Sequence, residues 1–173
     1  METKKTNLSE YNADAVPSGK GLHIAIVVAE WNATVTDNLL QGAYDTLVQF
    51  GTQEKDITVV HVPGSYELTS MADHLLTIAP HLDAVICLGC VIQGETRHFD
   101  FICEAVAHGI TEVSLRHDSP VIFGLLTTNN MQQALDRAGG QHGNKGIEAA
   151  VTALKMCSLY NKLNDEPWSF NLE

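Results

Sequence analysis

The chain has 173 residues, which suits one domain with a full hydrophobic core, and 45% of them are hydrophobic. Its formal net charge of −11 argues against nucleic acid and anionic membrane surfaces as partners. No apolar run approaches the length of a membrane span, and residues 1–20 are polar. We therefore expect a cytoplasmic protein without a signal peptide.

The N-terminal part predicts a tail, a strand and a helix. Residues 1–20 lack hydrophobic periodicity, and we expect them to be flexible. The apolar, β-branched run 22–29 predicts the first strand, and a helical stripe follows over 35–50. Trp31 and Asn32 come just after that strand. At such a place a tryptophan can belong to the core or stack on a planar ligand.

A second strand is predicted over 56–62, followed by a proline–glycine turn and a helical face over 68–79. Ser65 is a candidate N-cap for this helix. Glu67 falls in the first turn, where a carboxylate offsets the helix dipole. Its other interpretation is a hydrogen-bond acceptor for a polyol or an amine.

The stretch 88–100 indicates a site. The apolar run 84–92 predicts a buried strand, and a helical pattern begins near His98 after a turn that contains Gly94. Free backbone N–H groups at such a junction bind anions, and a histidine there can transfer protons near neutral pH. The alternatives are an ordinary surface histidine and a cap formed by Thr96.

Two pairs of side chains suggest metal or redox chemistry, and we interpret both more simply. Cys87 and Cys90 lie three apart in a predicted strand, so their side chains face opposite sides. We expect reduced, mostly buried thiols. His108 and Glu112 are four apart on a predicted helix, and we expect a solvated pair because no third ligand appears.

The C-terminal part begins with a fourth predicted strand over 121–128. Asn129 with Gln132 resembles an N-cap and its partner, and we expect a short helix after them. A glycine-rich stretch, 138–146, then leads into a last helix expected over about 147–160.

Four strands that alternate with helices predict an α/β fold, a flavodoxin-like three-layer αβα sandwich. Right-handed crossovers give its four-stranded parallel sheet the order 2-1-3-4. We expect a single α/β domain over 21–163, between the flexible tail of residues 1–20 and a loose tail of residues 164–173.

Four segments in register resemble the lumazine synthase family over about residues 20–160. They are Glu30-Trp31-Asn32, Val62-Pro63-Gly64-Ser65-Tyr66-Glu67, the stretch 88–100, and Arg137-Ala138-Gly139 with Gly143-Asn144-Lys145-Gly146. The resemblance implies condensation of 5-amino-6-(D-ribitylamino)uracil with 3,4-dihydroxy-2-butanone 4-phosphate. The products would be 6,7-dimethyl-8-ribityllumazine, phosphate and water, and neither a metal nor an organic cofactor is expected.

The resemblance also implies a role for individual residues. His98 matches the proton-transfer residue, and Phe123, Arg137 and Lys145 match residues that reach the site from a neighbouring subunit. The residues matched to pyrimidine and ribityl contacts are Trp31, Asn32, Ser65, Tyr66, Glu67, Cys90, Val91, Ile92, Phe123 and Lys145. Those matched to phosphate contacts are Glu95, Thr96 and Arg137. Gln93 departs from the family pattern, since many members have arginine there, and Ser65-Tyr66 replaces the commoner Ala-Phe.

The family forms homo-oligomers with active sites between subunits, so the expected partners are small-molecule substrates and further copies of the chain. We expect pentamers, twelve of which form a 60-subunit shell, because the link between Arg137 and Gly143 resembles that of shell-forming members. Riboflavin synthase is a candidate partner. One alternative is a non-catalytic flavin-binding or shell-forming relative, against which Glu67, His98 and Arg137 together argue. Another is the archaeal-type riboflavin synthase, against which the phosphate-binding pattern argues.

Overall fold

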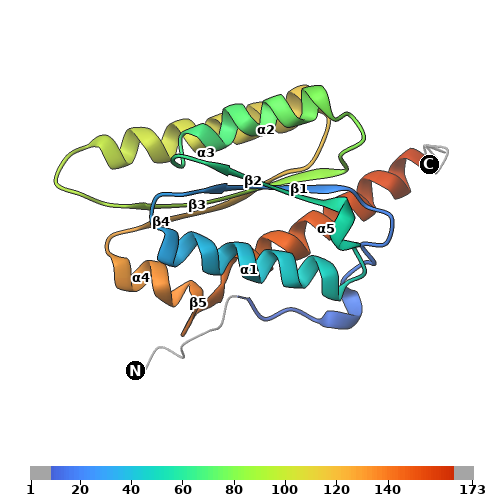
Figure 1. Cartoon of the computed structure of the whole chain (residues 1–173), viewed down its shortest axis with the longest axis horizontal. Coiled ribbons are helices and arrows are strands. Elements are labelled where there is room, and N and C mark those ends of the chain that lie inside the picture. The colour runs from blue at the N-terminus through green and yellow to red at the C-terminus, as the bar shows by residue number, and fades with distance from the viewer. Residues whose placement is uncertain (1–8, 166–173) are drawn as a thin grey trace, which may run out of the picture.

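A four-stranded parallel sheet lies between two layers of helices in the computed structural model, which describes residues 9–165 (Figure 1). The strand order β2-β1-β3-β4 confirms the predicted topology. The elements of the two helical layers and the sheet are β1 (Ile24–Ala29), α1 (Ala33–Gln49), β2 (Ile57–Val62), α2 (Glu67–Ile78), β3 (Ala84–Ile92), α3 (His98–His117), β4 (Val121–Thr128), α4 (Met131–Asp136) and α5 (Lys145–Asp165). Residues 1–8 and 166–173, which belong to the two expected tails, lie outside the described residues.

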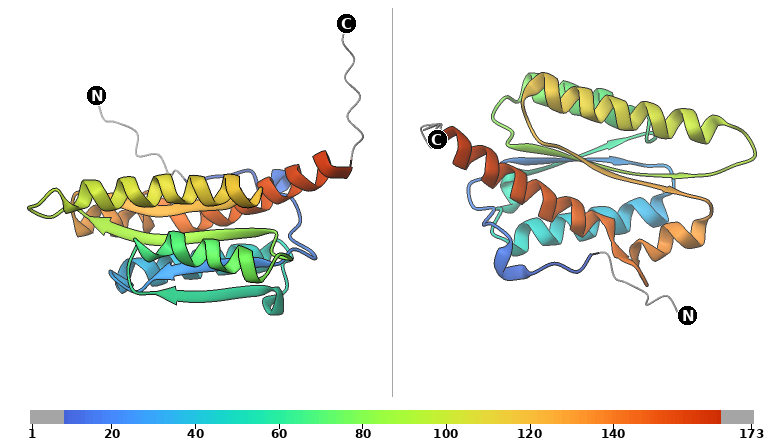
Figure 2. Two further views of the ribbon diagram at one scale, coloured as in Figure 1. Left: turned by 90° about the horizontal axis from the view of Figure 1, so that it is seen from above. Right: turned by 180° about the vertical axis from the view of Figure 1, so that it is seen from behind.

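The sheet is covered on both faces, which explains why its inner strands are apolar at every position. All six residues of β1 are buried. Ile24, Ile26 and Val28 pack with α1 and α5, whereas Ala25 and Val27 pack with α2 and α3. Figures 1 and 2 show α2 and α3 on one side of the sheet and α1, α4 and α5 on the other. None of the helices within residues 9–165 is long and apolar enough to cross a membrane.

Strand β3 shows the same alternation in its two cysteines. Cys87 packs with the α2–α3 layer and Cys90 with the α1–α5 layer, which confirms that the two thiols face opposite sides. Burial raises the pKa of Cys87 to about 12 and that of Cys90 to about 11. Thiols with such pKa values stay protonated at neutral pH, so neither one is an activated nucleophile.

Two expected helix caps are wrong. Helix α2 begins at Glu67 with Tyr66 at the N-cap position, so Ser65 is not its cap. Ser65 is buried instead. For α4 the cap lies one residue later than expected, because the Asn130 side chain accepts a hydrogen bond from the backbone N–H of Gln133 at 2.9 Å.

The glycine-rich stretch forms a small antiparallel hairpin that was not predicted. Its strands are β5 (Ala138–Gly140) and β6 (Gly143–Asn144). Gly139 and Gly143 have φ values of 107° and 85°, which glycine adopts at no steric cost. Helix α5 then starts directly at Lys145, earlier than expected, and continues to Asp165. The hairpin therefore connects α4 to the N-terminus of α5.

The described part of the N-terminal segment, residues 9–20, lies against the domain, although a flexible tail was expected over this stretch. A short 3₁₀ helix, η1 (Ala13–Ala15), occurs in it. The ring of Tyr11 packs edge-on against Phe50, with ring centroids 6.1 Å apart. At one end Ser9 is buried against the hairpin, and at the other the Gly19 N–H donates to the Phe50 carbonyl oxygen at 2.8 Å.

Candidate functional site

A cavity of about 250 Å³ opens where β1 and β3 end, and we call it the strand-end cavity. Parallel strands in an open α/β sheet place ligand sites at this edge. Of its nine lining residues, all but Ile102 belong to the predicted site. They are Trp31, Asn32, Ser65, Tyr66, Cys90, Val91, Ile92, His98 and Ile102. The fold thus brings together segments that are far apart in the sequence.

Asn32 joins two of the strand ends. Its φ of 64° is in the left-handed region, which asparagine tolerates better than most residues. Although it occupies the N-cap position of α1, its side chain makes no cap bond there. The side-chain Nδ2 instead donates to the Cys90 carbonyl oxygen at 2.9 Å. This bond fixes the end of β1 against the end of β3 and leaves the indole of Trp31 outside the core.

Trp31 presents an open aromatic face to the cavity. Its relative exposure is 68%, so the interpretation of a core tryptophan is wrong. The turn opposite it contains Gly64, at which a Cβ atom would lie 2.7 Å from the indole ring. Glu67 closes that turn, because its Oε2 accepts a hydrogen bond from the Gly64 N–H at 3.0 Å. The indole and the turn therefore lie in close contact.

His98 is the first residue of α3 and is exposed at the cavity. Its backbone N–H lies 3.4 Å from the Thr96 Oγ1, so Thr96 is a weak acceptor at the helix start. Arg97 directs its charge to Asp100, with Nε 3.2 Å from Oδ2, and lies 5.9 Å from the Phe101 ring centroid. Glu95 and Thr96 are exposed in the preceding turn and do not line the strand-end cavity.

The remaining predicted residues line a second cavity of about 530 Å³, which we call the hairpin cavity. Phe123, Arg137 and Lys145 belong to it, together with Leu125, Leu126, Thr127, Thr128, Gln133, Asp136 and His142. The Lys145 N–H donates to the Arg137 carbonyl oxygen at 2.9 Å, so the hairpin holds the backbones of these two residues together at the cavity that both of them line. Within the described chain the two cavities have no lining residue in common.

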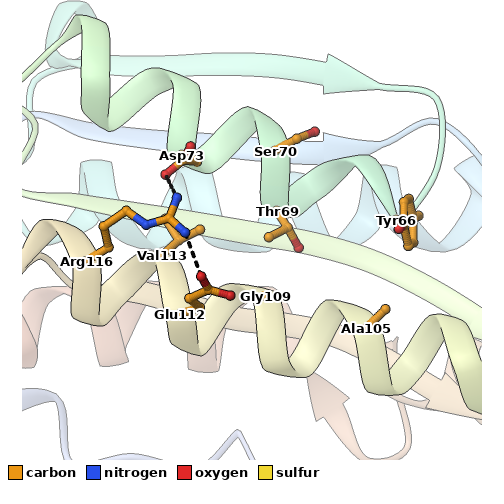
Figure 3. A pocket seen from close by; sticks show the side chains of 9 residues that line it. All are labelled: Tyr66, Thr69, Ser70, Asp73, Ala105, Gly109, Glu112, Val113 and Arg116. Atoms are coloured by element: carbon orange, nitrogen blue, oxygen red, sulfur yellow. Dashed lines mark hydrogen bonds and ion pairs between the residues drawn. The ribbon is translucent and has the colours of Figure 1, made fainter.

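A third hollow, not anticipated from the sequence, lies between α2 and α3 and shares Tyr66 with the strand-end cavity (Figure 3). Arg116 reaches across it and pairs with Asp73 at 3.0 Å and with Glu112 at 2.6 Å. His117 Nε2 lies 2.8 Å from Asp73. The charged side chains that line this hollow pair with one another, and the Arg116–Asp73 ion pair joins α3 to α2. The basic residues that end α3 were its signal in the sequence.

Metal-ligating side chains do not gather in the described part of the chain: no group of three or more His, Cys, Asp or Glu residues there could hold a metal ion. Glu112, which the sequence suggested as a partner of His108, pairs with Arg116. The chemistry available at the strand-end cavity is therefore that of an aromatic face, backbone hydrogen-bonding groups and one exposed imidazole.

The fold is that of an α/β protein, and the strand-end cavity is a candidate small-molecule site where its parallel strands end. A family model described as 6,7-dimethyl-8-ribityllumazine synthase matches residues 21–161. The chain belongs to this family, which confirms the resemblance seen in its motifs. It is accordingly an enzyme of the transferase class that serves riboflavin biosynthesis.

Similar proteins with the same name match this chain over nearly their whole length. The chain is 55% identical to the 6,7-dimethyl-8-ribityllumazine synthase of Parabacteroides distasonis over 159 residues, which cover 92% of this chain and 99% of the relative. It is 54% identical to that of Porphyromonas gingivalis over 159 residues, covering 92% and 98%. It is 49% identical to that of Bacteroides fragilis over 143 residues, covering 83% and 99%.

Proposed function

We propose that this protein condenses 5-amino-6-(D-ribitylamino)uracil with 3,4-dihydroxy-2-butanone 4-phosphate to give 6,7-dimethyl-8-ribityllumazine, phosphate and water. The observation that carries the proposal is the strand-end cavity, whose lining consists almost entirely of residues that match the family's substrate contacts. In this reaction the exposed indole of Trp31 stacks on the pyrimidine, and Glu67 accepts hydrogen bonds from the ribityl hydroxyls. The backbone of Cys90, Val91 and Ile92 reads the pyrimidine edge.

The proposed chemistry needs proton transfers and alignment more than a strong nucleophile. The 5-amino group attacks the ketone and water leaves, which forms an imine. Phosphate is then eliminated, which leaves an enol that becomes a ketone, and the nitrogen that bears the ribityl chain closes the ring on this carbonyl carbon with loss of a second water. His98 moves the protons, and the two substrates react because the site holds them in register, an effect that supplies several kcal/mol. Glu95, Thr96 and Arg137 hold the phosphate, for which a guanidinium fork is well suited.

The separation of the predicted residues into two cavities supports an active site that is shared between subunits. Phe123 lies on the edge strand β4 and is 39% exposed, and Leu115 on the neighbouring helix is 79% exposed. Apolar side chains of this size at a sheet edge favour contact with a second copy of the chain. In the proposed assembly the hairpin cavity of one subunit completes the strand-end cavity of the next. The assembly is a pentamer, and twelve pentamers form the shell.

The four cysteines support a cytoplasmic setting for this enzyme. Cys87, Cys90, Cys103 and Cys157 are all free thiols, and three of them are buried. Reduced cysteines are the rule in the cytoplasm, whereas secreted domains use theirs for disulfides. Riboflavin synthase, which would consume the product, belongs to the same proposed setting.

The function is tested by mixing the purified protein with the ribitylaminouracil and the butanone phosphate and following lumazine fluorescence. We expect acceleration above the spontaneous reaction, and a raised KM for the butanone phosphate in Arg137→Ala. A well-folded assembly that gives no acceleration would contradict the enzyme and favour a binding or shell protein. An unchanged KM in Arg137→Ala would contradict the role of that residue alone.

The shared site is tested by complementation. His98→Ala and Arg137→Ala remove groups from opposite halves of the proposed site, so each variant alone has no intact site. Co-assembled in equal amounts, they form a wild-type site wherever the two unmodified halves meet, at about a quarter of the interfaces. Recovered turnover in the mixture is the expected result. Activity that stays at the average of the two variants would place both residues in one subunit's site.

A further inference from the structure

Two contacts hold Lys145 in place, and the first is the hydrogen bond from its backbone N–H to the Arg137 carbonyl oxygen in the hairpin segment, at 2.9 Å. Its Nζ lies 2.9 Å from the Glu148 Oε2, one turn further along α5. The two side chains are 29% and 22% exposed, so the pair is largely shielded from water. Asn144 directly precedes α5, which begins at Lys145, so the position of the Asn144 backbone affects where the lysine side chain emerges.

Asn144 and Glu148 both bind the hydroxyl of one residue from the far end of the chain, Ser9. The Asn144 N–H donates to the Ser9 Oγ at 2.7 Å. The same Oγ lies 3.1 Å from the Asn144 carbonyl oxygen and 3.1 Å from the Glu148 Oε1. A hydroxyl has a single proton, which these two acceptors share. Ser9 therefore contacts the oxygen of Glu148 that Lys145 does not use.

The side chain of Asn144 is also held by hydrogen bonds. Together with the bond from its backbone N–H to Ser9, these bonds fix the position of Asn144. Its side-chain Nδ2 donates to the Asn38 carbonyl oxygen at 2.9 Å, and its Oδ1 accepts from the Gly146 N–H at 2.8 Å. Asn144 is only 8% exposed. Without the Ser9 oxygen its buried N–H would lose this acceptor, and the start of α5 would shift to find another.

We propose that Ser9 is a positioning residue for Lys145, acting through Asn144 and Glu148. This inference rests on the proposed function, in which Lys145 contacts the pyrimidine substrate. It gives the N-terminal segment a role in substrate binding, although the segment lines neither the strand-end cavity nor the hairpin cavity. The hydroxyl sets the direction of the lysine side chain and does not touch the substrate.

The test compares Ser9→Ala with Ser18→Ala in the full-length protein. Ser18 lies in the same segment, where its exposed hydroxyl accepts a local bond from the Lys20 N–H at 3.2 Å. We expect Ser9→Ala to raise the KM for the ribitylaminouracil about fivefold with kcat within about twofold, and Ser18→Ala to match the wild type. Amide hydrogen exchange at Asn144 should quicken only in Ser9→Ala.

A double-mutant cycle with Lys145→Ala separates positioning from general loosening. In the Lys145→Ala background, Ser9→Ala should raise the KM no further, because the group that it orients is gone. Additive effects would overturn the inference, as would a wild-type KM in Ser9→Ala beside a raised KM in Lys145→Ala. In both cases the wild-type protein still accelerates the reaction. If the wild-type protein itself does not accelerate the reaction, the proposed function is wrong, and the inference about Ser9 is wrong with it.

Discussion

The side-chain amide of Asn32 donates a hydrogen bond to the Cys90 carbonyl oxygen, 2.9 Å away, and so ties β1 to β3 at the edge where the strand-end cavity opens. Strands β1 and β3 pair directly only as far as Val28 and Leu88. Beyond these paired residues, the Asn32–Cys90 hydrogen bond joins the ends of the two strands. It also leaves one lone pair of the Cys90 carbonyl for a ligand.

Replacing Asn32 separates the contribution of this bond from that of the backbone conformation. Asn32→Ala loses the hydrogen bond and places a residue poorly suited to a φ of 64°, so we expect unfolding free energy to fall by about 2 kcal/mol. Asn32→Gly loses the bond but adopts that φ freely, and its loss should be about 1 kcal/mol smaller. Urea denaturation measures both. Equal losses in the two variants would mean that the left-handed conformation carries no strain.

His98→Ala should slow turnover by about 100-fold and leave a measurable residual rate. The residual rate is expected because alignment of the two substrates by the cavity does not depend on the imidazole. Single-turnover fluorescence is the measurement, and His74→Ala on the exposed face of α2 is the matched control, with wild-type turnover. Complete loss of activity in a His98→Ala protein with native assembly would argue against a mechanism dominated by alignment.

Gly146 lets the start of α5 lie close against the backbone of α1. A Cβ atom at this position would lie 1.9 Å from the Leu39 carbonyl oxygen, so α1 and α5 would have to move apart. We expect Gly146→Ala to cost about 3 kcal/mol of stability, the upper end for overpacking. At Gly94 a Cβ would meet nothing within 4 Å, and Gly94→Ala should leave the melting temperature nearly unchanged. Similar melting temperatures for both variants would refute the close approach.

The loss of unfolding free energy at acid pH should include a contribution from Asp73. Its hydrogen bond with His117, and then the charge of Arg116, hold its pKa below the ordinary value of 3.8. A carboxyl with a depressed folded-state pKa stabilises the fold above its unfolded pKa, and this stabilisation is lost as pH falls through the folded value. Asp73→Asn should therefore lose less stability than the wild type on acidification below pH 3.8.

The size of this effect is limited by solvent. The Asp73 side chain is 36% exposed, so the contribution should be less than about 1 kcal/mol. Urea denaturation at several pH values between neutrality and the acid transition measures it. Asp45→Asn, at an exposed position of α1, is the comparison variant. Parallel acid limbs for Asp73→Asn and the wild type would contradict the prediction.

The sheet could be predicted because its strands follow simple rules of burial. The runs that became β3 and β4 are apolar and end at turn residues, and their observed bounds equal the expected ones. The β5–β6 hairpin could not be predicted in this way. Its strands have three and two residues, too few to show any alternation of polar and apolar side chains, and its glycines indicate only a loop.

Local hydrogen bonds explain the misplaced caps. Both Asn129 and Asn130 are good N-cap residues, and the sequence does not say which of the two makes the bond. The structure selects Asn130, since Gln133 donates its N–H to that side chain and accepts from the Asn129 N–H through its own Oε1. Ser65 satisfied the same composition rule, but Tyr66 holds the N-cap position of α2, and the Ser65 side chain is buried near Gly89.

The residues that line the strand-end cavity could be predicted from the sequence, whereas the contacts that hold Lys145 in place could not. Residues at the carboxyl ends of parallel strands must meet at one edge, so Trp31, Ser65 and Cys90 follow from the topology. The contact of Ser9 with Asn144 joins positions 135 apart in the chain, and no periodicity or motif announces it. Long-range polar contacts of this kind depend on the packed arrangement of α1 and α5.

That separation has a consequence for the order of events during synthesis. A ribosome adds about 5–20 residues per second, so Ser9 emerges on the order of ten seconds before its partner exists. By then all four strands of the main sheet are complete, because β4 ends at Thr128. The contact between the N-terminal segment and the hairpin can therefore form only after every residue of the main sheet has been synthesised. A chain interrupted between Thr128 and Asn144 would carry a whole sheet with one layer of helices unfinished, a ready substrate for chaperones and proteases.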